Sequence, residues 1–105
     1  MSTTNNGRDN FRIEYSHRVA KEIEKLGKRA ISKGLWQQFF QAWGVISVSL
    51  RSAPEKFGDP LLDLPSMKLR VFHRIVFPVS LVFCVDAVRK LVYIKSVHPF
   101  PPDTY

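Results

Sequence analysis

The sequence predicts a small α+β fold: a four-stranded, mostly antiparallel sheet with two helices packed on one face. Four short segments are rich in alternating or continuous apolar residues, as strands are. Two longer segments, between the first and second of these, carry apolar residues three and four positions apart, which is the spacing of an amphipathic helix. The predicted order along the 105 residues is β-α-α-β-β-β, and this length fits a single domain.

The first half of the chain holds one predicted strand and both predicted helices. Residues 11–16 read FRIEYS, in which apolar and polar side chains alternate as in a half-buried strand. A helix is expected at about 18–31, with Ser16 as its N-cap. A second helix is expected at about 35–51, and it is apolar around so much of its circumference that two of its sides should be buried.

The second half holds a connector and the other three predicted strands. Residues 54–65 read PEKFGDPLLDLP, and their prolines and glycine are typical of a connector. The expected strands are 68–77, 79–86 and 91–98. A hairpin turn is expected at 86–90, between the last two strands. The first strand is expected to pair with the last or with the central one.

The domain is expected to span 11–99. Residues 1–10 are polar after Met1 and are expected to form a disordered leader. Residues 100–105 are expected to form a C-terminal tail, because the prolines of PFPPDTY cannot continue a strand.

Charge and cysteine content narrow the function classes. Sixteen Lys and Arg face nine Asp and Glu, a net charge of +7. Such an excess suggests nucleic acid or an acidic protein as partner, with a merely solvated basic surface as the alternative. The single cysteine, Cys84, lies in an apolar run and is expected to be inert core. The sequence shows no signal-peptide pattern and no apolar run near the roughly 20 residues that span a bilayer, so a cytoplasmic location is expected.

A basic and aromatic surface is predicted on the strand that reads LRVFHRIVF, residues 69–77. If its odd-numbered side chains meet the helices, Arg70 and Arg74 point together into the open side of the sheet with Phe72 between them. Tyr93 and Lys95 of the last strand, and Arg12 of the first, would join them. Cations interleaved with aromatics are typical of single-stranded nucleic-acid binding, although the same residues could be ordinary exposed side chains of a one-sided sheet.

Two histidines are candidates for proton transfer. His73 falls on the predicted core side, where a lone histidine is more often a packed, hydrogen-bonded residue. His98 ends the last predicted strand. No cysteine or paired carboxylate stands at ligand spacing from a histidine, so no metal site is predicted, and no phosphate loop or nucleophile elbow is present.

The second predicted helix carries large aromatics on an outer side, namely Trp36, Phe40 and Trp43. Such residues are more often core than interface. If they form an exposed contiguous patch, they would instead bind a partner protein or a second copy of the chain.

With these elements in order, the chain resembles the RelE/ParE superfamily of toxins from toxin–antitoxin systems. Three segments carry the resemblance: FRIEYS before a Lys-rich helix, LRSAPEKFGDPLLDLP after the second helix, and SLVFCVDAVRKLVYIKSV as the closing hairpin. RelE-like members cut mRNA at the ribosome by attack of a 2′-hydroxyl on the adjacent phosphate, without a metal or other cofactor. ParE-like members instead poison DNA gyrase. In both, an antitoxin wraps the toxin.

The resemblance implies site residues as well. The basic residues of the family's second strand have counterparts in Arg70, His73 and Arg74, and the family's Arg or His after the fourth strand has one in His98. Ser80 stands where the family has an Arg at the start of the third strand. We therefore expect an endoribonuclease with Arg70, His73, Arg74 and His98 at the site. The alternative is a non-catalytic protein that binds an antitoxin, gyrase or another partner.

Overall fold

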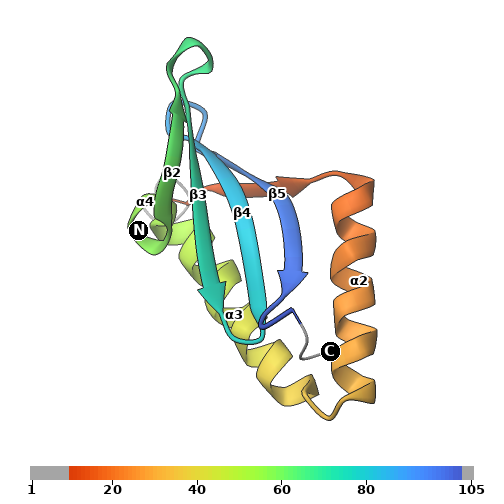
Figure 1. Cartoon of the computed structure of the whole chain (residues 1–105). Coiled ribbons are helices and arrows are strands. Elements are labelled where there is room, and N and C mark those ends of the chain that lie inside the picture. Colours follow the sequence, from red (N-terminus) through yellow and green to blue (C-terminus); the bar gives the residue numbers. More distant parts are fainter. Residues whose placement is uncertain (1–9, 103–105) are drawn as a thin grey trace.

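The computed structural model describes residues 10–102, which form a five-stranded mixed sheet with helices on one face and along one side (Figure 1). The elements are β1 (Arg12–Tyr15), α2 (His17–Ser32), α3 (Trp36–Ser52), α4 (Pro54–Phe57), β2 (Asp59–Leu64), a 3-10 turn (Pro65–Met67), β3 (Leu69–Val76), β4 (Val79–Asp86) and β5 (Leu91–Pro99). Residues 1–9 of the predicted leader and residues 103–105 of the predicted tail lie outside the described residues. No helix of the described part is long and apolar enough to cross a membrane.

The strand order in the sheet is β1-β5-β4-β3-β2. β1 pairs with β5 in parallel, and the other three pairings are antiparallel. In Figure 1, α3 crosses behind the sheet and α2 runs beside β5. The α+β class and the pairing of the first strand with the last are thus confirmed. The prediction of four strands and two helices is wrong, because the described part contains a fifth strand and the short third helix α4.

The missed strand is β2, at residues that were expected to form a connector. The prolines of that connector suggested a break, since proline has no N–H to donate to a strand ladder. β2 lies at the edge of the sheet, however, and an edge strand needs ladder hydrogen bonds on one side only. The register against β3 shifts between Pro60 and Leu62, which absorbs the irregularity.

The core lies between α2, α3 and one face of the sheet. Helix α2 begins at His17, and the Ser16 hydroxyl before it accepts a hydrogen bond from the Val19 amide at 3.2 Å, as an N-cap does. Helix α3 buries four residues three and four positions apart against the central strands: Phe39, Ala42, Ile46 and Leu50. The helix periodicity read from the sequence is therefore also the periodicity of burial.

The face of β3 that meets the helices is the opposite of the predicted one. Phe72 is 1% exposed and stacks on Phe83 of β4, with 5.5 Å between ring centroids. Because side chains alternate along a strand, Arg70 and Arg74 share the helix side with Phe72. The other side of the sheet, which we call the open face, carries the remaining alternate residues: Leu69, Val71, His73 and Ile75 of β3, Ser80, Val82, Cys84 and Asp86 of β4, and Leu91, Tyr93, Ser96 and His98 of β5.

A bulge in β5 moves its last residues to new faces. Phe83 pairs with Ile94 and Val82 pairs with Ser96, so Lys95 is an extra residue in the ladder. Strict alternation from the predicted placement of Tyr93 and Lys95 would put Val97 on the open side and His98 on the helix side. Beyond the bulge this assignment is wrong, because Val97 is 2% exposed in the core and His98 pairs with Ser80 on the open face.

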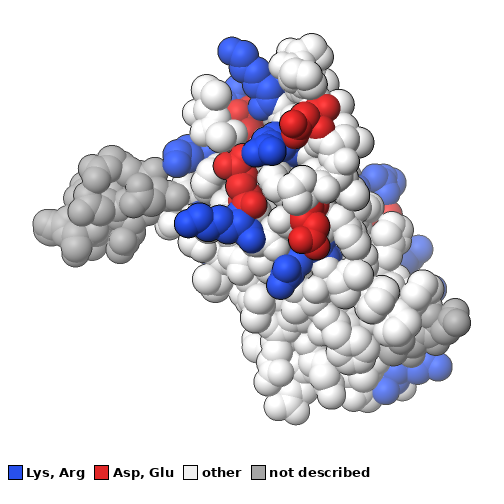
Figure 2. All heavy atoms as spheres, turned by 60° about the vertical axis from the view of Figure 1, so that its left-hand side comes forward, with Lys and Arg blue, Asp and Glu red and all other residues white. Residues whose placement is uncertain are grey.

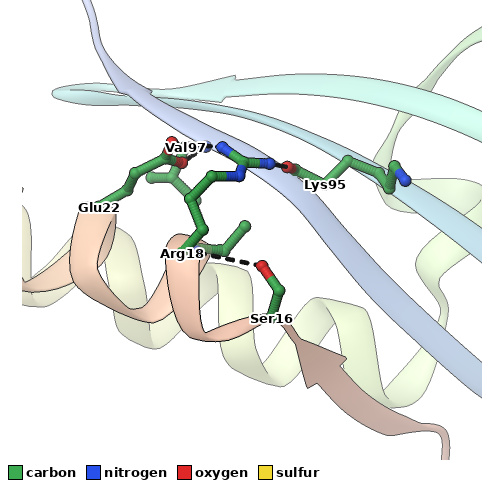
Figure 3. Close-up of polar contacts among 6 residues, drawn as sticks. Ser16, Arg18, Glu22, Lys95 and Val97 are labelled. Atoms are coloured by element: carbon green, nitrogen blue, oxygen red, sulfur yellow. Dashed lines mark hydrogen bonds and ion pairs between the residues drawn. The ribbon is translucent and has the colours of Figure 1, made fainter.

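Two side chains of α2 continue the ladder where β1 ends. Beyond Tyr15 no strand of the described residues pairs with the outer edge of β5. Arg18 donates a hydrogen bond from Nη2 to the Lys95 carbonyl at 3.2 Å, and Glu22 accepts one from the Val97 amide at 3.4 Å (Figure 3). Arg18 and Glu22 also pair with each other at 2.6 Å, so this contact fixes α2 to the sheet edge.

Candidate functional site

The predicted site residues separate into two groups on opposite sides of the sheet. Arg70 and Arg74 lie on the helix side of β3, near α4. The open face holds His73, His98 and Tyr93. The predicted cations and His98 therefore do not lie on one side of the sheet, and the prediction that Arg70 and Arg74 line the open face is wrong.

Arg70 is occupied by carboxylates. Its Nε lies 3.0 Å from Oδ1 of Asp63 on β2, and its Nη1 lies 3.9 Å from Oε2 of Glu55 on α4. The hydrogen bond and charge of Asp63, with a smaller effect of Glu55, raise the pKa of Arg70 above its ordinary value. Figure 2 shows acidic groups interleaved with basic ones over this side of the molecule. A guanidinium in such surroundings is poorly placed to attract a phosphate.

Arg74 has a packing role. Its guanidinium carbon lies 5.0 Å from the centroid of the Phe57 ring on α4, a cation–π distance. Its Nε is buried and makes no hydrogen bond to any residue in the described range. We conclude that Arg74 joins α4 to the back of β3.

Three polar side chains run across the open face from β3 to β5. Nε2 of His73 lies 3.1 Å from Oγ of Ser80 on β4. Ser80 pairs directly with His98 of β5, and Asp59 of the edge strand β2 pairs directly with His73. Standard strand spacing with an offset of two residues puts the Cα atoms of His73 and His98 roughly 12 Å apart. The expected packing of His73 in the core is not found, because the side chain lies on the open face.

A cavity of about 310 Å³ lies at one end of this face, where the end of β1 and the start of α2 meet β5. It is lined by Tyr15, Ser16, Arg18, Val19, Leu69, Cys84, Tyr93, Ile94 and Lys95. Tyr93 and Lys95 were predicted for this face. Tyr15 and Arg18 were not predicted there. Tyr15 pairs in register with Ile94 of the helix side and borders the cavity where its strand ends. The sequence gives no sign that α2, which carries Arg18, starts beside β5.

The charges around the cavity are mostly paired. Arg18 is held by Glu22, and Arg12 lies 3.0 Å from Glu14 on the neighbouring part of β1. Lys95 has no carboxylate partner among residues 10–102. Burial raises the pKa of the Cys84 thiol, and the nearby Lys95 ammonium partly opposes this shift.

The aromatic side chains predicted for partner binding divide between core and surface. Trp36 is 47% exposed and Phe40 is 66% exposed, and their ring centroids lie 5.9 Å apart. Trp43 packs against the core and stacks on Phe39 with 6.5 Å between centroids. Within residues 10–102, no three His, Cys, Asp or Glu side chains gather as metal ligands would.

The fold resembles that of a solved structure. A chain of the archaeal RelE–RelB complex from Pyrococcus horikoshii OT3 superposes with a TM-score of 0.56, over 87% of this chain and 96% of that chain. This chain therefore has a RelE-like fold. The two sequences are 16% identical, so the likeness to RelE establishes the fold alone. No family model matches the sequence, and no curated protein matches it.

The residues of the open face can be compared with the site residues that the resemblance to the family implied. The resemblance read from the sequence implied site residues on the second strand and after the fourth, namely Arg70, His73, Arg74 and His98. On this RelE fold the open face carries His73, His98 and Tyr93, and the cavity beside it carries Lys95. The two arginines of β3 lie elsewhere. The candidate site is therefore composed of two histidines, a tyrosine and a lysine.

Proposed function

We propose that this protein is the toxin of a toxin–antitoxin pair and that its open face cleaves mRNA at the ribosome. The observation that supports this best is the row of His73, Ser80 and His98 across β3, β4 and β5, on a RelE fold. The similar chain was solved as a RelE–RelB complex, and we propose an antitoxin as partner here too. The net charge of +7 favours an RNA substrate.

The proposed reaction needs two proton transfers and a positive charge. One histidine takes the proton of the ribose 2′-hydroxyl while that oxygen attacks the adjacent phosphorus. The bond from phosphorus to the 5′ oxygen breaks, and the other histidine gives this oxygen a proton. The products are a 2′,3′-cyclic phosphate and a 5′-hydroxyl. A spacing of roughly 12 Å between the two Cα atoms leaves room for a phosphate between the imidazoles. Lys95 supplies positive charge on the same side of β5.

The test is induced expression with growth, translation and mRNA 5′ ends followed in the same cultures. We expect growth arrest and mRNA cleavage from the wild type. Both should be lost in a His73→Gln, His98→Gln variant, because glutamine can keep a hydrogen bond to Ser80 but cannot carry the proton.

The matched control is an Arg70→Gln, Arg74→Gln variant, which also loses two basic side chains of the sheet. Circular dichroism of the purified control variant shows whether it is folded. If the open face is the site, the folded control variant should still cleave mRNA. Cleavage lost in a folded arginine variant and kept in the histidine variant would overturn the assignment. Absence of growth arrest from the wild type would overturn the toxin role.

A second candidate function is non-catalytic binding of gyrase or another protein through the outer side of α3. The exposure of Trp36 and Phe40 favours it, since large exposed aromatics are enriched where proteins meet. This function predicts growth arrest with intact mRNA. It also predicts that a Trp36→Gln, Phe40→Gln variant loses the arrest while the histidine variant keeps it, the reverse of the result expected for the ribonuclease.

A further inference from the structure

We infer that Arg18 and Glu22 of α2 are positioning residues for His98, because they hold the bulge of β5 that turns His98 to the open face. The inference rests on the proposed function for the task of His98, which is to carry a proton. Neither residue is placed at the reacting atoms, and both act through the backbone of β5.

The bulge decides on which side of the sheet His98 lies. With Lys95 as an extra residue, His98 pairs with Ser80 on the open face. In a ladder without the extra residue, each later residue of β5 would pair one position earlier on β4, and His98 would pair with the fully buried Val79. Such a shift by one residue moves every side chain to the other face. The proposed proton carrier is therefore on the open face only in the bulged form.

The bulge also changes which backbone groups of β5 point to its outer edge. Before the bulge they belong to even-numbered residues, since the Lys90 carbonyl accepts a hydrogen bond from the Arg12 amide at 2.9 Å and groups on one side of a strand repeat every second residue. After the bulge they belong to odd-numbered residues, namely the Lys95 carbonyl and the Val97 amide. The outward position of these two groups is specific to the bulged form.

Arg18 and Glu22 are spaced to match these two groups. They stand four residues apart on α2, a rise of about 6 Å, and their partners stand two residues apart on β5, which is about 6.6 Å. Figure 3 shows the two side chains reaching from α2 to Lys95 and Val97 of β5. The two side chains also form an ion pair with each other, which holds both in place. A regular strand would turn both backbone groups away from α2, so the pair stabilises the bulged form selectively.

The docking of α2 on the sheet depends mainly on apolar side chains. Val19, Leu26 and Ala30 of this helix are buried in the common core. The side chains of Arg18 and Glu22 are 67% and 27% exposed, and ion pairs with exposed partners add little to stability. Loss of the pair should therefore free the end of β5 while α2 stays in place.

The burial of Val97 sets the size of the expected effect. This side chain is 2% exposed, and the regular form of β5 would move it to the open face. Its burial therefore favours the bulged form independently of α2. Loss of the pair should loosen the bulge without abolishing it, so we expect a several-fold effect on His98 and not a complete loss of function.

The first experiment follows β5 by NMR in the purified protein, with Glu22→Ala, Glu22→Gln and Glu24→Ala as variants. Glutamine keeps an oxygen that can accept the Val97 amide, alanine removes it, and Glu24 is an exposed glutamate of the same helix. In Glu22→Ala we expect several-fold faster exchange of the Val97 amide and a weaker NOE between the side chains of His98 and Ser80. Glu22→Gln should restore most of both, and Glu24→Ala should match the wild type.

The second experiment measures mRNA cleavage by the same proteins on purified ribosomes. The pair acts on a proton carrier and not on RNA binding, so Glu22→Ala should lower kcat several-fold with KM nearly unchanged, and Glu22→Gln should recover kcat. The Tm of Glu22→Ala should fall by less than about 8 °C, which keeps the protein folded during the assay. Arg18→Gln removes the other member of the pair and serves if Glu22→Ala does not fold.

Two results would overturn the inference: equal amide exchange and equal NOE in the wild type and Glu22→Ala, or an altered β5 with unchanged kcat. Absence of cleavage by the wild type itself would overturn the proposed function instead. The NMR measurements would then still decide whether Arg18 and Glu22 hold His98 on the open face.

Discussion

Replacement of Gly58 by alanine tests how closely the link between α4 and β2 packs against the sheet. The backbone at Gly58 has φ −98° and ψ 163°, which any residue can adopt, so conformation does not require glycine here. Space does: a Cβ would lie 2.6 Å from Cζ of Phe83 and 2.7 Å from Cβ of Phe72. Both phenylalanines are fully buried, and a Cβ cannot rotate away from its own backbone.

The expected cost of Gly58→Ala is about 1–3 kcal/mol, the usual range for adding a methyl group to a packed core. For a chain of this size each kcal/mol lowers Tm by roughly 4–8 °C, so thermal unfolding followed by circular dichroism resolves the effect. Gly44→Ala is the matched control. A Cβ at Gly44 meets nothing within 4 Å, and the helix interior should gain roughly 0.5–1 kcal/mol. A Tm of Gly58→Ala at or above that of the wild type would refute the close approach of Gly58 to the two rings.

Three further predictions concern single side chains. Phe72→Ala should cost about 3–5 kcal/mol in denaturant unfolding, because the ring is fully buried; a loss under 1 kcal/mol would mean that Phe72 faces solvent. Ser16→Ala should cost about 1 kcal/mol through loss of the α2 cap, with Ser16→Asp restoring most of it, and equal unfolding midpoints for all three proteins would disprove the cap. Burial raises the pKa of the Cys84 thiol, and only the thiolate is alkylated readily. The pH at which the alkylation rate increases should therefore be higher in the native protein than in urea. Lys95→Gln should move that rise higher still, and coincident native and unfolded profiles would contradict the burial.

Most of the helices and strands could be predicted because their patterns are strong. The period of apolar residues located α2 and α3 within one or two residues, and Ser16 is the cap that the sequence indicated. The boundaries of β4 are those expected, since Pro78 and the turn after Asp86 delimit an almost wholly apolar run. Local chemistry determines such features, so local sequence is sufficient to find them.

The face of β3 could not be read from its own pattern. Both of its sides carry apolar residues, and the side with the larger number, which includes Leu69, Val71 and Ile75, is the open one. What decides is a contact far away in the sequence, the packing of Phe72 on Phe83 under α3. The two arginines follow Phe72 to the helix side, and the predicted site changed with them.

The strand β2 and the bulge in β5 were missed for related reasons. Prolines permit a strand only at an edge, and whether a segment is an edge depends on the whole sheet. The extra residue Lys95 has no local signature, yet it turns His98 towards Ser80 and the open face. The features of the candidate site thus depend on how separate segments meet.

The parallel pairing of β1 with β5 has a consequence for the order in which the protein can fold during synthesis. Residues 12–15 pair with residues 91–94, so the first strand cannot pair until nearly the whole chain has been synthesised. Tyr93, Lys95 and His98 all belong to that late strand. An emerging polypeptide can therefore form its helices early but cannot assemble the proposed site until β5 has left the ribosome. For a protein proposed to attack translation, this order would spare the ribosome that is making it.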